Sequence, residues 1–222
     1  MILRTKYETK KIEQTMHYKN EAVLSYKISY PVFESAVFFA PASRINRYYK
    51  DKAMAFERYC RTALYRMACE SADYAKKNSY PLMQLEAVQN FLVTYNENCA
   101  LSLYFDRYIF TGGAHGTTER FSQSWELSSG GSRISLSELF KKDFDYIRYV
   151  KNKVVDEIKK DKTAYFDDFE QNVSDTLNKN NFYITPEGLF IYFGQYDIAP
   201  YSTGIPVFLI TYEKDGAMPP RC

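Results

Sequence analysis

The chain has 222 residues, which suits one large domain better than two. Hydrophobic residues make up 45% and charged residues 25% of it, as in an ordinary globular protein. The 29 Lys and Arg residues nearly balance the 27 Asp and Glu residues, and the short basic clusters are interleaved with acids. This balance excludes the concentrated basic face of a typical nucleic-acid-binding protein, so no nucleic-acid partner is predicted.

The N-terminal part of the chain predicts a strand followed by a long helix. Residues 1–11 are basic but lead into no apolar run, so neither a signal peptide nor a transmembrane segment is predicted. The chain is then either intracellular or separated from its anchor. Residues 22–32 alternate apolar and polar side chains, as in a half-buried strand. Apolar residues at helical spacing then predict a helix from an N-cap at Ser43 to about Lys77.

The remainder predicts mainly hairpins. Alternating patterns predict strands over three stretches, residues 88–95, 99–110 and 119–127. Ser135 and Glu138 form a capping-box pattern, and a second helix is expected over residues 144–160. Short helical pieces over 165–177, a hairpin over 182–193 and a strand over 207–212 complete the chain.

The element order β-α-βββ-α-βββ predicts an α+β fold. Hairpins predominate, so we expect a mainly antiparallel sheet with the long helix and the second helix packed on one face. The sequence contains no internal repeat and no Pro/Ser-rich linker, and residues 1–222 are predicted to form a single domain.

The four cysteines are Cys60, Cys69, Cys99 and Cys222. None forms a CxxC pair, so no metal site is predicted, and no sequence feature calls for a cofactor. We predict that all four are unpaired, because their spacing suggests no bridge and Cys222 lies at a terminus, where chains fray. Free thiols favour a reducing compartment.

A glycine-rich loop at residues 111–116 contains Gly112, Gly113, His115 and Gly116. A strand follows it, whereas a phosphate-binding loop leads into a helix, so we interpret it as a shaped connection between strands. At least one of the glycines is expected to hold a backbone conformation that a side chain would strain. His115 is interpreted as a structural residue, with ligand contact as the first alternative and general-base catalysis as the second.

A second loop, before the last strand, contains Tyr196, Asp197 and Tyr201. Tyrosines beside a carboxylate suit contacts with a sugar or a peptide, and these three residues with His115 are the candidate ligand-binding set. Packing of the loop onto the sheet is the favoured interpretation, and ligand contact is the alternative. No catalytic residue is predicted: Asp167, Asp168 and Glu170 form an acidic cluster, but adjacent carboxylates on a helix point different ways.

Four segments together resemble a known family. They are the glycine-histidine loop, Ser135–Phe140, Phe182–Leu189, and Tyr196–Tyr201 with Gly204. They are similar to the extracellular region of RsiV-type anti-sigma factors, which pairs two bacterial domain families, here over residues 7–110 and 111–213. Similar domains also precede peptidoglycan deacetylase domains.

The resemblance implies a non-catalytic binding or sensing module of the bacterial envelope, exposed outside the cell. In the family, this region binds lysozyme and thereby triggers sigma-factor release, so lysozyme and cell-wall glycan are the candidate ligands. One alternative is a small hydrolase that acts on glycan or peptide through His115. Another is an intracellular protein with a regulatory role. The oligomeric state is left open.

Overall fold

The computed structural model describes residues 4–213 and 216–221 and has the predicted α+β fold. The chain falls into two compact units, and strands β3, β4 and β5 contribute residues to both. The first, here called the helix-covered unit, comprises Lys6–Phe91 and Phe105–Thr118. The second, the C-terminal unit, comprises Met1–Thr5, Leu92–Tyr104 and Glu119–Cys222. The prediction of a single domain with halves 7–110 and 111–213 stays a prediction.

A six-stranded sheet has the strand order β1-β2-β3-β4-β5-β6. Its strands are β1 (Lys6–Tyr18), β2 (Glu21–Glu34), β3 (Leu85–Glu97), β4 (Ala100–Phe110), β5 (Thr117–Glu126) and β6 (Ser132–Arg133). Strand β1 pairs antiparallel with β2, whereas β2 and β3 are parallel, because the long helix connects them.

Strand β1 was not predicted from the sequence. Most of its side chains are exposed, and only Ile12, Met16 and Tyr18 are partly buried against the core. Apolar alternation is the main sequence signal of a strand, and here it is weak. Backbone pairing with β2 along the whole strand therefore defines β1.

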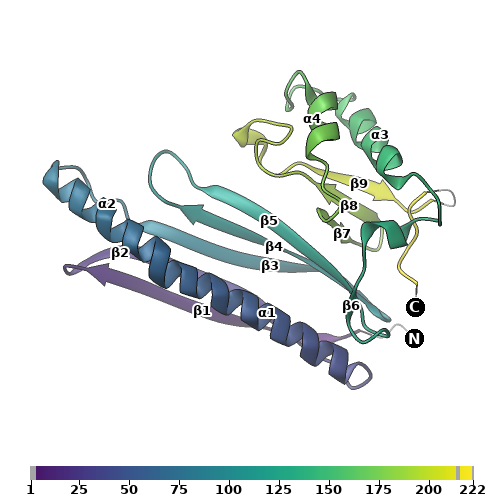
Figure 1. Ribbon diagram of the computed structural model, residues 1–222, viewed down its shortest axis with the longest axis horizontal. Coiled ribbons are helices and arrows are strands. Elements are labelled where there is room, and N and C mark those ends of the chain that lie inside the picture. The colour runs from purple at the N-terminus through teal and green to yellow at the C-terminus, as the bar shows by residue number, and fades with distance from the viewer. Residues whose placement is uncertain (1–3, 214–215, 222) are drawn as a thin grey trace. The chain divides into compact units, whose positions relative to one another are not determined.

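The long helix covers one face of the sheet in the helix-covered unit (Figure 1). It consists of α1 (Phe39–Tyr59), a π-helical turn (Cys60–Leu64) and α2 (Tyr65–Lys77). It begins at Phe39, one turn before the predicted N-cap at Ser43. Its apolar stripe packs against every second residue of β2, and Phe56, Cys60 and Leu64 are buried there with Leu24 and Ile28.

Asn46 of α1 takes the place of a strand partner at the end of β2. The Phe33 N–H donates to Asn46 Oδ1 at 2.7 Å, and Asn46 Nδ2 donates to the Phe33 carbonyl oxygen at 2.9 Å. One amide side chain thus satisfies both backbone groups of Phe33, much as a ladder neighbour would.

The C-terminal unit contains a second sheet, with the antiparallel order β7-β8-β9. Its strands are β7 (Phe182–Ile184), β8 (Gly188–Tyr192) and β9 (Val207–Thr211). Helices α3 (Tyr146–Ile158) and α4 (Phe169–Thr176) pack on it through a common core (Figure 1). The predicted capping box is present, with Ser135 and Glu138 at the start of a 3-10 turn, η2 (Leu136–Leu139).

Within the C-terminal unit, a buried pair of serines links β4 and β5 to β7. The hydroxyls of Ser102 and Ser124 lie 2.8 Å apart, and the Ile184 N–H donates to Ser102 Oγ at 2.9 Å. Ser102 is fully buried and Ser124 nearly so, and each has its hydrogen-bond partner there. The alternating pattern predicts that each serine lies on one face of its strand. It does not predict that β7 contacts that face.

Among residues 4–213 and 216–221, no helix has both the length and the apolar character needed to cross a membrane.

Candidate functional site

The loop between β8 and β9 is held at several points and presents two tyrosines. Ile198 and Ala199 are buried in the core of the C-terminal unit. The Phe166 N–H donates to the Ile198 carbonyl oxygen at 3.1 Å, and the Phe193 N–H donates to the Pro206 carbonyl oxygen at 3.0 Å, which closes the base of the loop. Thr203 Oγ1 donates to the Ala164 carbonyl oxygen at 2.8 Å. The loop is therefore a fixed platform, although most of it lacks regular structure.

Tyr196 stands out from this platform. Its side chain is 56% exposed and its φ angle is +67°, in the left-handed region that bulky residues rarely adopt. Such a conformation costs about 1–3 kcal/mol and persists where the surroundings enforce it, often at sites of recognition. The ring of Tyr196 lies 5.9 Å from that of Tyr201, the first residue of the 3-10 turn Tyr201–Thr203. The structure thus brings two of the candidate residues together.

Asp197 holds the loop from within. Its Oδ2 accepts a hydrogen bond from the Gly194 N–H at 2.7 Å, and its own N–H donates to the Gly194 carbonyl oxygen at 3.2 Å. A Cβ on Gly194 would lie 3.0 Å from this carboxylate oxygen. The carboxylate therefore closes a turn that positions Tyr196, which gives Asp197 a structural role besides its predicted contact with ligand.

The glycine-histidine loop belongs to the helix-covered unit, where it joins β4 to β5. Gly112 has φ +100° and Gly113 has φ +89°, as expected for positions that a side chain would strain. Gly116 is required for another reason, since a Cβ there would lie 2.5 Å from the Ile109 carbonyl oxygen and from the Tyr108 ring. His115 is exposed, and its Nδ1 lies 3.2 Å from the Gly116 carbonyl oxygen. It lies in a different unit from Tyr196, Asp197 and Tyr201.

The sequence did not reveal an aromatic cluster in the C-terminal unit. The guanidinium carbon of Arg120 lies 3.9 Å from the ring centroid of Tyr104, whose ring is 4.9 Å from that of Tyr183. Tyr183 in turn stacks on Phe190, with centroids 5.2 Å apart. The alternation of β4 and β5 could place Arg120 and Tyr104 on one face, but nothing in the sequence indicates that β7 packs there.

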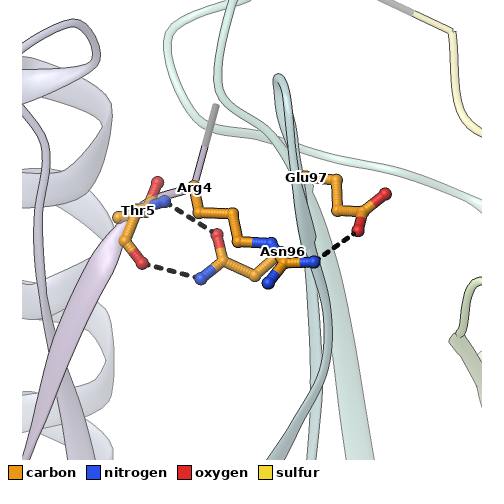
Figure 2. Close-up of polar contacts among 4 residues, drawn as sticks. All are labelled: Arg4, Thr5, Asn96 and Glu97. Carbon is orange, nitrogen blue, oxygen red and sulfur yellow. Dashed lines mark hydrogen bonds and ion pairs between the residues drawn. The ribbon is translucent and has the colours of Figure 1, made fainter. Parts of the chain in front are cut away.

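Four residues tie the start of the described chain to the end of β3 (Figure 2). The Thr5 N–H donates to Asn96 Oδ1 at 3.0 Å, and Asn96 Nδ2 donates to the Thr5 carbonyl oxygen at 2.7 Å. Beside them, the guanidinium of Arg4 lies 3.0 Å from a carboxylate oxygen of Glu97. Asn96 thus repeats the arrangement that Asn46 makes with Phe33.

The cysteine prediction is wrong for Cys99, which is disulfide-bonded. Cys99 lies in the turn between β3 and β4, and its Sγ is 3.8 Å from the carbonyl oxygen of Arg221, a residue 122 positions away in the sequence. The spacing of cysteines along the sequence does not predict a contact between residues so far apart. Cys60 and Cys69 are free, as predicted, and Cys222 lies outside the described residues. Burial raises the pKa of the Cys60 thiol to about 11, so at neutral pH it is a protonated core residue.

No group of three or more His, Cys, Asp and Glu side chains suited to a metal ion occurs in the described parts of the chain.

Two family models match successive parts of the chain. One described as "Deacetylase PdaC" matches residues 17–118, and one described as "Protein of unknown function (DUF3298)" matches residues 137–213. The predicted pairing of two domain families is therefore confirmed, whereas the resemblance to RsiV-type anti-sigma factors stays a prediction.

One curated relative is peptidoglycan-N-acetylmuramic acid deacetylase PdaC of Bacillus subtilis (strain 168). It is 22% identical over 178 residues, which cover 79% of this chain and 34% of the relative. The chain therefore spans about a third of that protein's length.

Two solved structures share the fold. A DUF3298 family member from Bacteroides fragilis superposes with a TM-score of 0.67 at 18% identity, covering 94% of this chain and 90% of the other. A DUF3298 family protein from Pseudomonas aeruginosa PAO1 gives a TM-score of 0.62 at 14% identity, with 95% and 91% covered.

Proposed function

We propose that the chain is a non-catalytic binding or sensing module of the bacterial envelope and that the loop bearing Tyr196 and Tyr201 contacts its ligand. The observation that carries the proposal is the exposed side chain of Tyr196 on a left-handed backbone, within a loop whose residues Ile198 and Ala199 are buried in the core. A rigid, exposed aromatic side chain loses little conformational entropy on binding, and tyrosine is enriched at the centres of interfaces.

Two observations support a location in the bacterial envelope. The deacetylase relative acts, by its name, on peptidoglycan, a polymer of the envelope. The disulfide at Cys99 suits an oxidising compartment and disfavours the alternative of an intracellular regulatory protein.

The candidate ligands are lysozyme and cell-wall glycan. Paired tyrosine rings suit both, because they can stack on sugar rings and can also anchor a protein interface. Charge does not favour lysozyme: animal-type lysozymes are basic, and this chain carries a net charge of +2.

The alternative of a hydrolase would place the chemistry at His115. His115 is an exposed residue of the loop that joins β4 to β5, whereas general-base catalysis gains from a site that excludes water. The position of His115 therefore favours a binding role over a catalytic one.

Calorimetric titration of the chain with lysozyme and with soluble peptidoglycan fragments tests the proposal. One of the two is expected to bind, and Tyr196→Ala and Tyr201→Ala should each weaken binding by at least about tenfold, or 1.4 kcal/mol. Tyr74→Ala is the matched control, since Tyr74 is 62% exposed on α2 in the other unit.

Tyr196→Gly separates recognition from stability. Glycine adopts positive φ without strain, so this variant should be at least as stable as the parent and still lose binding. If neither ligand binds the folded chain, or if the tyrosine variants bind as well as the parent, the proposal is wrong.

A further inference from the structure

A second surface, in the helix-covered unit, has the features of a ligand site. It is a hollow of about 430 Å³ on the sheet formed by β1, β2 and β3. Its volume lies within the range of about 300–1,000 Å³ that small-ligand sites occupy. The helix does not cover this face, because Leu24 and Ile28, which pack with the helix, alternate along β2 with Ser25 and Lys27, which line the hollow.

The strand register arranges the side chains of this hollow in two rows. Glu13 of β1 lies opposite Lys27 of β2, which lies beside Val88 of β3. In the next row, Thr15 lies opposite Ser25, which lies beside Glu86. Adjacent strands are about 4.8 Å apart, so each row spans about 10 Å. These six residues, here called the sheet-face set, all line the hollow.

The polar members of the sheet-face set make no contacts with one another. In the described parts of the chain, the side chains of Glu13, Thr15, Ser25, Lys27 and Glu86 form no hydrogen bond or ion pair, although Glu13 and Lys27 are directly opposite each other. Charged residues elsewhere on this unit do pair. Lys10 lies 2.7 Å from Glu8 on the same strand, and Lys19 lies 2.7 Å from Asp73.

The chemistry of the set selects one class of ligand. Two carboxylates accept hydrogen bonds, one ammonium donates them, and two hydroxyls do both. The set carries a net charge of −1, which disfavours an anion, and Val88 is its one apolar side chain, which disfavours a lipid or an apolar peptide. A neutral molecule that offers many hydroxyl donors and acceptors at a spacing of a few ångströms fits best.

We infer that the sheet-face set binds a neutral, hydroxyl-rich saccharide. The inference rests on the proposed function for the source of this ligand, the envelope, and on the side chains of the hollow for its chemistry. It gives the helix-covered unit a recognition surface of its own, separate in sequence from the tyrosine loop.

Titration of the full chain with two neutral oligosaccharides, a tetramer of N-acetylglucosamine and cellotetraose, tests the inference by amide NMR shifts. At least one should cause saturable shifts at residues 13, 15, 25, 27, 86 and 88. Glu86→Gln and Lys27→Met should each weaken this binding about tenfold. Glu70→Gln and Lys50→Met are the matched controls, because both side chains are exposed on the helix, and they should leave it unchanged.

Three outcomes would overturn the inference. They are no saturable shift with either oligosaccharide at millimolar concentration, tighter binding of a sulfated oligosaccharide than of the neutral ones, and shifts confined to the loop of Tyr196. The third outcome would still support the proposed function. Conversely, a Tyr196→Ala variant that keeps the shifts at the sheet-face set would support the inference, even if the tyrosine loop proved to have no ligand.

Discussion

Positive φ angles at Gly112 and Gly113 fix the shape of the hairpin loop that carries His115. A Cβ on Gly113 would have no atom within 4 Å, so its substitution tests backbone strain alone. Gly113→Val should lower the free energy of unfolding by about 1–3 kcal/mol. Ala114→Val, at the exposed neighbouring residue with no positive φ, is the control.

His115→Ala should destabilise less than Gly113→Val, because the histidine side chain is exposed. Thermal melts of the three variants measure these differences. A neutral Gly113→Val together with loss of ligand binding in His115→Ala would instead show that the loop serves recognition.

At the scale of the elements, the pairing of Asn96 with Thr5 connects the end of β3 to the residue before β1 (Figure 2). Thr5 is only 6% exposed, so Asn96→Ala would leave its backbone N–H and C=O buried and unpaired. Each such group costs about 1–3 kcal/mol. We expect a loss of about 2–4 kcal/mol in urea unfolding and faster hydrogen exchange at the Thr5 amide.

The neighbouring ion pair supplies the control for this prediction. Glu97→Gln removes the pairing with Arg4, whose side chain is 70% exposed, and should change stability by less than about 1 kcal/mol. If Asn96→Ala is as mild as Glu97→Gln, the asparagine does not hold the strand.

The sequence predicted the helices and strands in which burial of one face produces a regular spacing of apolar residues. Strand β2 and the stripe of the long helix follow from apolar residues such as Leu24, Ile28, Phe56 and Leu64. Strand β1 was not predicted because both of its faces are mostly polar. The start of α1 was not predicted because Phe38 and Phe39 carry no capping side chain. Neither feature has the apolar period or the capping residue that a sequence-based prediction uses.

The sequence predicted only part of the candidate site. Tyr196, Asp197 and Tyr201 were found because aromatic and acidic residues gather in one loop. The left-handed backbone of Tyr196 was not, because propensity would assign that conformation to Gly or Asn. The stack of Arg120, Tyr104 and Tyr183 and the sheet-face set depend on strand neighbours and register, which only the structure supplies.

For the molecule as a whole, the disulfide at Cys99 makes stability depend on redox conditions. A native disulfide typically contributes about 2–4 kcal/mol. Cys99→Ser should therefore lower the Tm by several degrees, and reductant should lower the Tm of the parent to a similar value. Cys69→Ser, at a free and partly exposed cysteine, is the control and should melt like the parent. If reductant leaves the parent's Tm unchanged, the bridge does not stabilise the fold.

The two asparagine pairings have a consequence for solubility. A backbone N–H and C=O left open near the end of a strand form a template that can recruit the strand of another molecule. At Phe33 and at Thr5 these groups are already occupied by the side chains of Asn46 and Asn96. Each asparagine therefore protects its strand end against edge-to-edge aggregation, and replacing it would expose a pairing template to other molecules.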